Sequence, residues 1–268
     1  MSFITAGLSP LLAPFVKQYW SMDELIPQGE SCIQRIVPGG LSEMIFYFGE
    51  TPVYSRDKRS QAGRVIISGQ QTGYYELEVK GRIDLFSVQF KPEGVKALFN
   101  FHPSEIANTS IEADSMPDIE ASLLCEALSE KGTFAARKEI MEAFLIKRLS
   151  LNYHISFDRI ADSVQTINRN RAIIGVDSLA YRACLSIRQY ERFFTSTIGT
   201  SPIQFLRIVR FQSAIDYRRM NPDLPLTSIA LDSGYYDQSH MIADFRKLSG
   251  LTPGEFFAEC EPVSDYFS

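Results

Sequence analysis

A pattern that occurs twice near the C-terminus constrains the fold of this chain more than any other sequence feature. The series F-x4-G-x-[ST]-P-x-x-F starts at Phe194 and again at Phe245. Glycine is common just after a helix, and proline suits the first turn of the next one. Apolar pairs lie upstream at nearly equivalent places, Leu179-Ala180 and Ile229-Ala230. Each copy therefore predicts a short helix, a tight turn, a second helix, a glycine stop and a helix that begins with proline, which is helix-turn-helix geometry appearing twice.

The region from about residue 155 to 257 is predicted to be helical throughout. The expected helices are Phe157–Arg169, Val176–Cys184, Ser186–Thr197, Pro202–Met220, Leu226–Ser233, Asp237–Leu248 and Pro253–Ala258. We expect Ser186, Ser201, Asp237 and Thr252 to be N-caps. The 19 residues of Pro202–Met220 correspond to roughly 28 Å of helix. Successive major-groove faces on one side of DNA lie roughly 34 Å apart, so this linker could place two helices in adjacent grooves.

The second helix of each predicted pair has an apolar face and a polar face. The inward residues are Tyr190, Phe193, Phe194 and Thr197 in the first pair and Met241, Phe245 and Leu248 in the second; the outward ones are Arg188, Glu191, Arg192 and Thr195, then Ser239, Ile242, Ala243 and Arg246. A lone amphipathic helix of this kind is more often a solvated face with local ion pairs. The repeat, the turn spacing and the two arginines together favour a helix that enters the major groove. An arginine there can discriminate guanine by about 1–3 kcal/mol.

The first hundred residues predict β-structure, followed by helices. Short β-branched or aromatic runs separated by turn residues are Ser31–Val37, Glu43–Phe48, Val65–Ser68, Tyr74–Val79 and Ile83–Phe90. Such a series suggests a small barrel or sandwich. Helices are expected at Val95–Phe99, Met116–Ser129 and Phe134–Leu149.

Composition favours an ordinary globular protein. The chain has 268 residues, enough for two modest domains, with 45% apolar and 22% charged residues. No signal peptide is visible at the N-terminus, and Met44–Phe48 is too short to span a bilayer, so we expect a cytoplasmic protein without membrane contact. The cysteines Cys32, Cys125, Cys184 and Cys260 lie far apart, which is typical of reduced structural thiols.

Net charge argues mildly against a nucleic-acid partner. The chain carries a net charge of -5, whereas DNA-binding domains are usually basic. The charge is uneven: residues 1–150 hold 15 Lys and Arg against 19 Asp and Glu, and residues 151–257 hold 12 against 10. DNA binding would therefore depend on a few placed cations and helix N-termini.

Long ordered motifs in the helical region resemble a known family. They are G-T-S-P-I-Q-F-L-R from Gly199, the linker with Ala214, and I-A-L-D-S-G-Y-Y-D-Q-S-H-M-I-A-D-F-R-K-L-S-G-L-T-P-G-E-F from Ile229. Residues 155–258 resemble the AraC/XylS family of bacterial transcription regulators. The resemblance implies that the second helix of each pair contacts DNA. By position, the implied DNA-binding residues are Ser186, Arg188, Gln189, Glu191 and Arg192, then Gln238, Ser239, His240, Arg246 and Lys247.

The sequence departs from that family at Ala243, where members often carry an arginine. This alanine has no side chain for a bidentate base contact, although it could touch a thymine methyl group. Arg246 and Lys247 are suited to phosphates. We therefore expect the first pair to supply most of the sequence discrimination and the second pair mainly affinity.

Motifs in the N-terminal part resemble an uncharacterised domain often attached to these regulators. They are Tyr19-Trp20, Val37-Pro38-Gly39-Gly40, Glu43-Met44-Ile45-Phe46, Ile67 to Thr72 (I-S-G-Q-Q-T) and Phe90-Lys91-Pro92-Glu93-Gly94. The resemblance implies a cupin-like barrel that senses a ligand and dimerises. The expected fold is α+β. Residues 1–150 are expected to form a sensor and dimerisation domain, with a small β-barrel to about residue 92 followed by helices. An all-α double helix-turn-helix DNA-binding domain joined by a long linker helix is expected over 151–260, with a tail at 261–268. The implied partners are double-stranded DNA, a small-molecule effector, RNA polymerase and a second copy of the chain.

An enzyme is the alternative interpretation. The chain has three histidines, His102, His154 and His240, none in a predicted strand, so a histidine-rich metal site is not expected. No phosphate loop or GxSxG motif occurs, so we expect no catalytic residue, metal or cofactor. Residues that could line an apolar pocket are Trp20, Tyr47, Gln70, Gln71, Tyr74, Tyr75 and Gln89, without assignment of any one to a ligand. The open alternative is a small barrel enzyme or sugar-binding protein with a structural helical tail, against which Arg188 and Arg192 argue.

Overall fold

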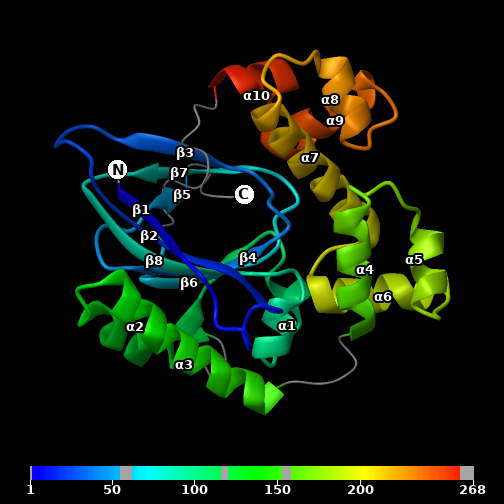
Figure 1. Cartoon of the computed structure of the whole chain (residues 1–268). Coiled ribbons are helices and arrows are strands. Elements are labelled where there is room, and N and C mark those ends of the chain that lie inside the picture. Colours follow the sequence, from blue (N-terminus) through cyan, green and yellow to red (C-terminus); the bar gives the residue numbers. More distant parts are fainter. Residues whose placement is uncertain (1, 55–61, 116–119, 153–157, 260–268) are drawn as a thin grey trace.

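The computed structural model describes residues 2–54, 62–115, 120–152 and 158–259 (Figure 1). The proposed tail at 261–268, Cys260 and His154 lie outside the described residues. Residues 2–152, here called the N-terminal region, are rich in sheet, and residues 158–259, here called the C-terminal region, are helical. The fold is therefore of the mixed α+β class. None of the helices in the described part of the chain has the length and apolarity that crossing a membrane requires.

The described strands of the N-terminal region form two antiparallel sheets. The six-stranded sheet has the order β1 (Ser2–Ala6), β2 (Val16–Leu25), β8 (Arg82–Phe90), β4 (Ser42–Tyr47), β6 (Val65–Ser68) and β9 (Ser110–Glu112); the three-stranded sheet has the order β3 (Cys32–Ile36), β7 (Tyr75–Val79) and β5 (Val53–Tyr54). All five strands expected from the sequence are present. The single closed barrel is not observed, because the described strands hydrogen-bond within two separate sheets and not around one ring.

The central strands of the larger sheet are buried on both faces. Successive side chains of a strand point to opposite faces, so in β4 Met44 and Phe46 join one hydrophobic cluster while Ile45 and Tyr47 join another. The second cluster lies between the two sheets and includes Trp20 of β2. Apolar contact across the gap therefore holds the sheets together, which explains why a run such as S-E-M-I-F-Y is buried at every position.

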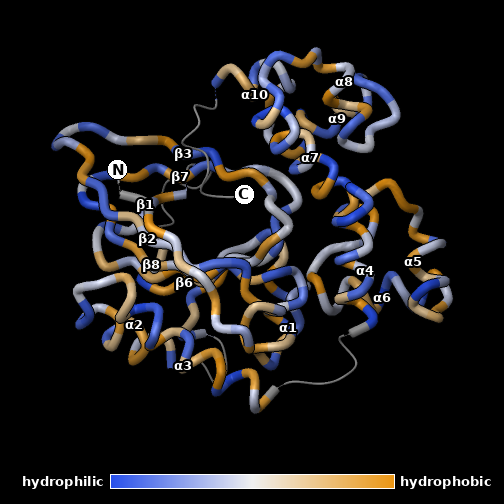
Figure 2. The backbone as a smooth tube through the Cα atoms, in the orientation of Figure 1, coloured by the Kyte–Doolittle hydropathy of each residue, from blue (hydrophilic) through white to orange (hydrophobic). Residues whose placement is uncertain are grey.

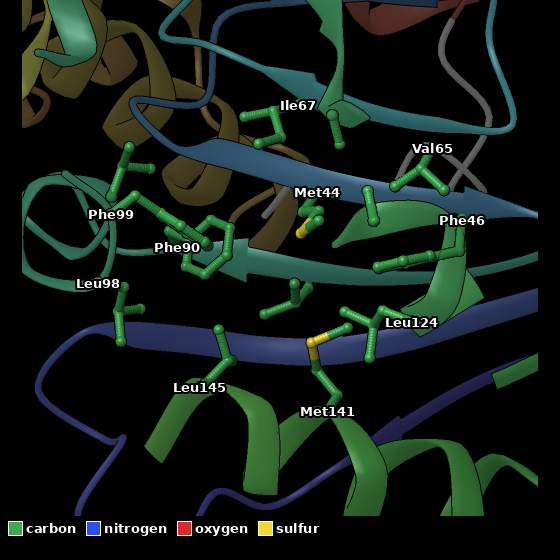
Figure 3. Packing of buried hydrophobic residues seen from close by; sticks show 14 of the residues in the cluster. Met44, Phe46, Val65, Ile67, Phe90, Leu98, Phe99, Leu124, Met141 and Leu145 are labelled. Atoms are coloured by element: carbon green, nitrogen blue, oxygen red, sulfur yellow. The ribbon is translucent and has the colours of Figure 1, made fainter. Parts of the chain in front are cut away.

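Helices cover the other face of the six-stranded sheet (Figure 1). They are α1 (Gly94–Leu98), α2 (Ala121–Ser129) and α3 (Phe134–Asn152), with short 3-10 turns at Pro103–Ile106 and Ala113–Ser115. Leu124, Met141 and Leu145 pack against Met44 and Phe46 of the sheet (Figure 3). Full burial of one such side chain contributes about 1.5–3 kcal/mol, so this layer is a main source of stability. The part of the expected helix at 116–119 lies outside the described residues.

The C-terminal region contains two small helical cores joined by one long helix. Its helices are α4 (Asp158–Arg169), α5 (Val176–Arg182), α6 (Ile187–Ile198), α7 (Pro202–Met220), α8 (Leu226–Asp232), α9 (Gln238–Ser249) and α10 (Pro253–Glu259). Helix α7 has the bounds expected from the sequence. It contributes Phe205 and Leu206 to the first core and Ile208, Phe211 and Ala214 to the second. Hydrophobic and hydrophilic residues alternate along these helices (Figure 2), and α7 fixes the two cores relative to each other.

The two regions are in direct contact along α7. The side-chain amide of Gln212 donates to the carbonyl of Pro38 at 2.7 Å. Gly40 has a positive φ of 72°, and a Cβ there would lie 3.4 Å from the ring of Phe205. The Val37-Pro38-Gly39-Gly40 motif is thus a turn that lies against the linker helix, with Val37 packed on its second core.

Candidate nucleic-acid interface

The two copies of the repeat have the same local geometry. Gly199 and Gly250 follow α6 and α9 in the left-handed conformation, with φ of 97° and 79°. The first phenylalanine of each copy contacts the last: the ring centroids of Phe194 and Phe205 are 5.7 Å apart, and those of Phe245 and Phe256 are 5.6 Å apart. The two helix-turn-helix units predicted from the repeat are therefore confirmed as structure.

The turn inside each unit is also equivalent, with one difference in residue type. The N–H of Leu185 donates to Ala180, and the N–H of Tyr235 donates to Ala230, both at 3.0 Å. The residue before each donor is Cys184 with φ of 55° and Gly234 with φ of 85°. Glycine adopts this conformation without strain, whereas an L-residue with a Cβ is strained there by about 1–2 kcal/mol. The second unit has one more residue before its helix, which accounts for the offset between the repeats.

Helix α6 is anchored at its start by a capping box. The hydroxyl of Ser186 accepts from the N–H of Gln189 at 3.3 Å, and the side-chain oxygen of Gln189 accepts from the N–H of Ser186 at 3.1 Å. These two predicted DNA-binding residues therefore fix the helix N-terminus. The amide nitrogen of Gln189 is not used by the box.

The exposed face of α6 carries the remaining predicted residues of the first unit. Arg188, Glu191 and Arg192 are exposed, while Tyr190 and Phe194 on the opposite face are fully buried. Neither arginine forms a salt bridge with another described residue. The arrangement gives a rigid helix with two cations directed to solvent, which is chemically suited to bidentate contacts with guanine or with phosphate.

Helix α9 presents a different face at the equivalent positions. Asp237 caps it by accepting from the N–H of His240 at 2.8 Å. Gln238 is half-buried, and Ser239 and His240 are exposed. Six residues after the cap, where α6 has Arg192, stands the exposed Ala243. The cations Arg246 and Lys247 follow in the last turn of the helix, so the positive charge of α9 lies away from its N-terminal half.

The C-terminal end of α9 faces the N-terminal region. Lys247 lines a groove of about 420 Å³ together with Gln71, Gly73 and Tyr74. A Cβ on Gly250 would lie 2.7 Å from the ring of Tyr74. Lys247 is thus placed beside the N-terminal region. Arg246 is exposed and does not line this groove.

A buried carboxylate that sequence reasoning missed fixes α9 on the linker helix. The side chain of Asp244 is 5% exposed, and its Oδ1 lies 2.8 Å from Nε of Arg207 on α7. Its Oδ2 lies 3.9 Å from Nε2 of His240, whose ring meets the edge of Tyr235. Burial raises the pKa of Asp244 above its usual range, while Arg207 and His240 act to lower it. The sequence did carry a signal for this burial: Asp244 lies three residues after Met241, which places the acid on the apolar face of the helix.

The residues expected to line a pocket in the N-terminal region are divided among several places. Trp20, Tyr47 and Tyr75 surround a cavity of only about 50 Å³ between the sheets. Gln71, Tyr74 and Tyr75 border the groove that contains Lys247. The two other glutamines are engaged in hydrogen bonds: Gln70 donates to the carbonyl of Gly40 at 2.8 Å, and Gln89 accepts from Gln18 at 2.7 Å.

A second unpredicted carboxylate lies at the small cavity. Oε1 of Glu43 accepts from Nε1 of Trp20 at 2.5 Å and from the hydroxyl of Ser87 at 2.7 Å. Burial raises the pKa of Glu43 to about 7, against the opposite effect of these hydrogen bonds. Within the described residues, no group of three or more His, Cys, Asp or Glu side chains is placed to hold a metal ion.

Comparison with sequence families finds two matches. Residues 179–259 match a family described as a helix-turn-helix domain, and residues 9–112 match a domain of unknown function, DUF6597. The first match covers both turns and both candidate helices, and the second covers most of the two sheets.

Similar proteins include transcription regulators. The arabinose operon regulatory protein of Salmonella typhimurium is 28% identical over 131 residues, which are 46% of this chain and 45% of that protein. An uncharacterized HTH-type transcriptional regulator of Haemophilus influenzae is 33% identical over 219 residues, 76% of this chain and 72% of the relative. Among solved structures, ToxT from Vibrio cholerae is 10% identical over 90% of this chain and 98% of its own, with a TM-score of 0.48. The chain spans just under half the length of the arabinose regulators it matches.

Proposed function

Because the chain belongs to the AraC family of helix-turn-helix transcription regulators, we propose that it binds double-stranded DNA sequence-specifically and so controls transcription. One observation carries the proposal: α6 presents Arg188 and Arg192 to solvent on a helix whose other face is locked by buried aromatic residues. The packed helix fixes the backbone from which each arginine projects, and the planar guanidinium loses less side-chain entropy per hydrogen bond than a lysine ammonium does.

The two candidate helices have different proposed roles. Arg188 and Arg192 of α6 read bases, with Glu191 and the amide nitrogen of Gln189 beside them. In α9 the proposed contacts are Gln238, Ser239 and His240 near the helix start and Arg246 and Lys247 on phosphates. Because Ala243 lacks a polar side chain, α9 contributes mainly affinity.

The N-terminal region is the proposed sensor. On this view residues 1–150 bind a small-molecule effector and a second copy of the chain, and residues 151–260 bind DNA and contact RNA polymerase in the cytoplasm. The hydrogen bond between Gln212 and Pro38 joins the two regions, which supports coupling between effector binding in the N-terminal region and DNA binding in the C-terminal region. The alternative of a barrel enzyme or sugar-binding protein is disfavoured, because the relative matched over 219 residues is a transcription regulator.

The experiment is a DNA-binding titration with the full chain at increasing salt. The logarithm of the affinity falls linearly with the logarithm of salt concentration, and each phosphate contact that a cation makes steepens this fall. We expect the double variant Arg188→Ala/Arg192→Ala to lose specific binding, while Lys131→Ala, which removes an exposed cation of the N-terminal region, binds as the parent does. An affinity that stays constant as salt rises would refute DNA binding through these cations.

A further inference from the structure

A cleft of about 720 Å³ lies where the N-terminal and C-terminal regions meet. Its walls include Phe15 and Leu41 from the first region, Val164 of α4, and Val209 and Asp216 of α7. Clefts that bind small molecules usually measure about 300–1,000 Å³ and combine apolar walls with a few polar groups. This cleft has that size and that lining, whereas the cavity between the sheets measures only about 50 Å³.

A buried carboxylate with one unpartnered oxygen lines this cleft. Glu93 is 6% exposed, and its Oε2 has no hydrogen-bond partner among the described residues. Burial raises the pKa of Glu93 to about 6, against the opposite effects of a hydrogen bond from its own backbone N–H and of the charge of Lys91. A buried polar atom without a partner is costly, so native proteins seldom keep one that nothing binds.

The backbone around Glu93 is held rigidly. The N–H of Lys91 donates to the carbonyl of Phe15 at 2.8 Å. A Cβ on Gly94 would lie 2.0 Å from that same carbonyl oxygen, so only glycine fits beside it. These contacts fix the backbone of the motif Phe90-Lys91-Pro92-Glu93-Gly94 and with it the position of the Glu93 carboxylate. The DNA-binding role does not use this motif.

The neighbouring cation is already engaged. Nζ of Lys91 donates to the carbonyl of Ala13 at 2.6 Å. On the far wall Asp216 adds a second carboxylate, and burial raises its pKa as well. Lys17 also borders the cleft, where burial lowers its pKa. The unpartnered atom, Oε2 of Glu93, is therefore an acceptor, and the ligand must supply a donor.

We propose that the cleft binds a small amphiphilic amine, whose protonated nitrogen donates to Glu93 and whose apolar body packs between Leu41 and Val209. A carboxylate ligand would bring like charge against Glu93. Since the walls come from both regions, an amine that fits one relative position of the regions better than another shifts the equilibrium between them. This role as effector rests on the proposed function, whereas binding itself does not.

The test uses the full chain and three probes with the same indole body: tryptamine, the neutral tryptophol and the anionic indole-3-acetate. Isothermal titration calorimetry measures each affinity. A hydrogen bond to a charged group corresponds to about tenfold or more in affinity, so we expect tryptamine to bind at least about tenfold more tightly than indole-3-acetate. Glu93→Gln should remove about tenfold of the tryptamine affinity, whereas Glu130→Gln, an exposed carboxylate after α2, should leave it unchanged.

A second variant keeps the test decisive if Glu93→Gln does not fold. Ser213→Phe places a large ring from α7 in the cleft and should abolish tryptamine binding. Absence of tryptamine binding to the parent, equal affinity for indole-3-acetate, or unchanged binding by the folded variants would overturn the proposal. DNA affinity measured without any probe separates the two ideas: a chain that binds tryptamine but no DNA refutes the proposed function and leaves the cleft site standing.

Discussion

Replacing Glu43 by glutamine should make the N-terminal region more stable at high pH and leave it nearly unchanged at low pH. The carboxyl group is fully buried between the sheets, and burial raises its pKa from 4.5 to about 7. In the unfolded chain the group ionises near its ordinary pKa. The folded state therefore holds a proton that the unfolded state has lost between these two values.

The sign and the magnitude follow from this difference. Below about pH 4.5 both states are protonated, so the stability contribution of the neutral carboxyl is fully present. As pH rises toward 7, the unfolded state gains from ionisation and the folded state does not, which lowers the free energy of unfolding by about 3 kcal/mol. Glutamine stays neutral throughout, and its oxygen can accept from Trp20 and Ser87 as the carboxyl does.

Urea denaturation followed by fluorescence measures the effect, since Trp20 is the only tryptophan of the chain and donates to Glu43. We expect Glu43→Gln to unfold with nearly the parent free energy at about pH 4, and with about 3 kcal/mol more at about pH 8. Glu30→Gln, an exposed carboxyl before β3, should match the parent at both values. A Glu43→Gln variant that is destabilised equally at both pH values would show that the reasoning about burial is wrong.

Three further substitutions have defined outcomes. Cys184→Gly relieves a left-handed residue in the first turn and should raise the free energy of unfolding by about 1 kcal/mol in chemical denaturation; a lowered value contradicts the strain. Asp244→Ala should cost about 1–3 kcal/mol by removing the carboxylate partner of the partly exposed Arg207, while the double variant Asp244→Leu/Arg207→Met recovers most of it; equal losses would exclude the ion pair. Ala243→Arg should add about 1–3 kcal/mol of base discrimination in a competition binding assay, and unchanged preference would argue against α9 entering the groove.

The helical third of the fold was predictable because its determinants are local. Glycine stops, first-turn prolines and caps are fixed by neighbouring residues, so α7 has its expected bounds and Ser201 accepts from Gln204. The strand β2 was not expected, because Lys17, Gln18, Asp23 and Glu24 interrupt its apolar pattern. Its pairing with β8, which is distant in sequence, determines that it is a strand.

Site residues divide in the same way. The exposed face of α6 and the N-cap role of Ser186 followed from the sequence, but the reciprocal role of Gln189 did not. The spacing of Ser186 and Gln189 fits a capping box, and the structure uses both side chains there. Asp244 and Glu93 were not predicted, since each acquires its role from a distant segment: Arg207 for the first, and the packing of Phe15 beside Gly94 for the second.

In the proposed division of roles, α6 reads bases while α9 mainly supplies affinity. A selection of bound duplexes from a random pool, made with the full chain and with Arg192→Ala and Arg246→Ala, tests it most directly. We expect Arg192→Ala to relax base preference at defined positions of the site. We expect Arg246→Ala to weaken binding to all sequences alike and to reduce the salt slope by about 1. Greater relaxation of base preference by Arg246→Ala than by Arg192→Ala would contradict the account.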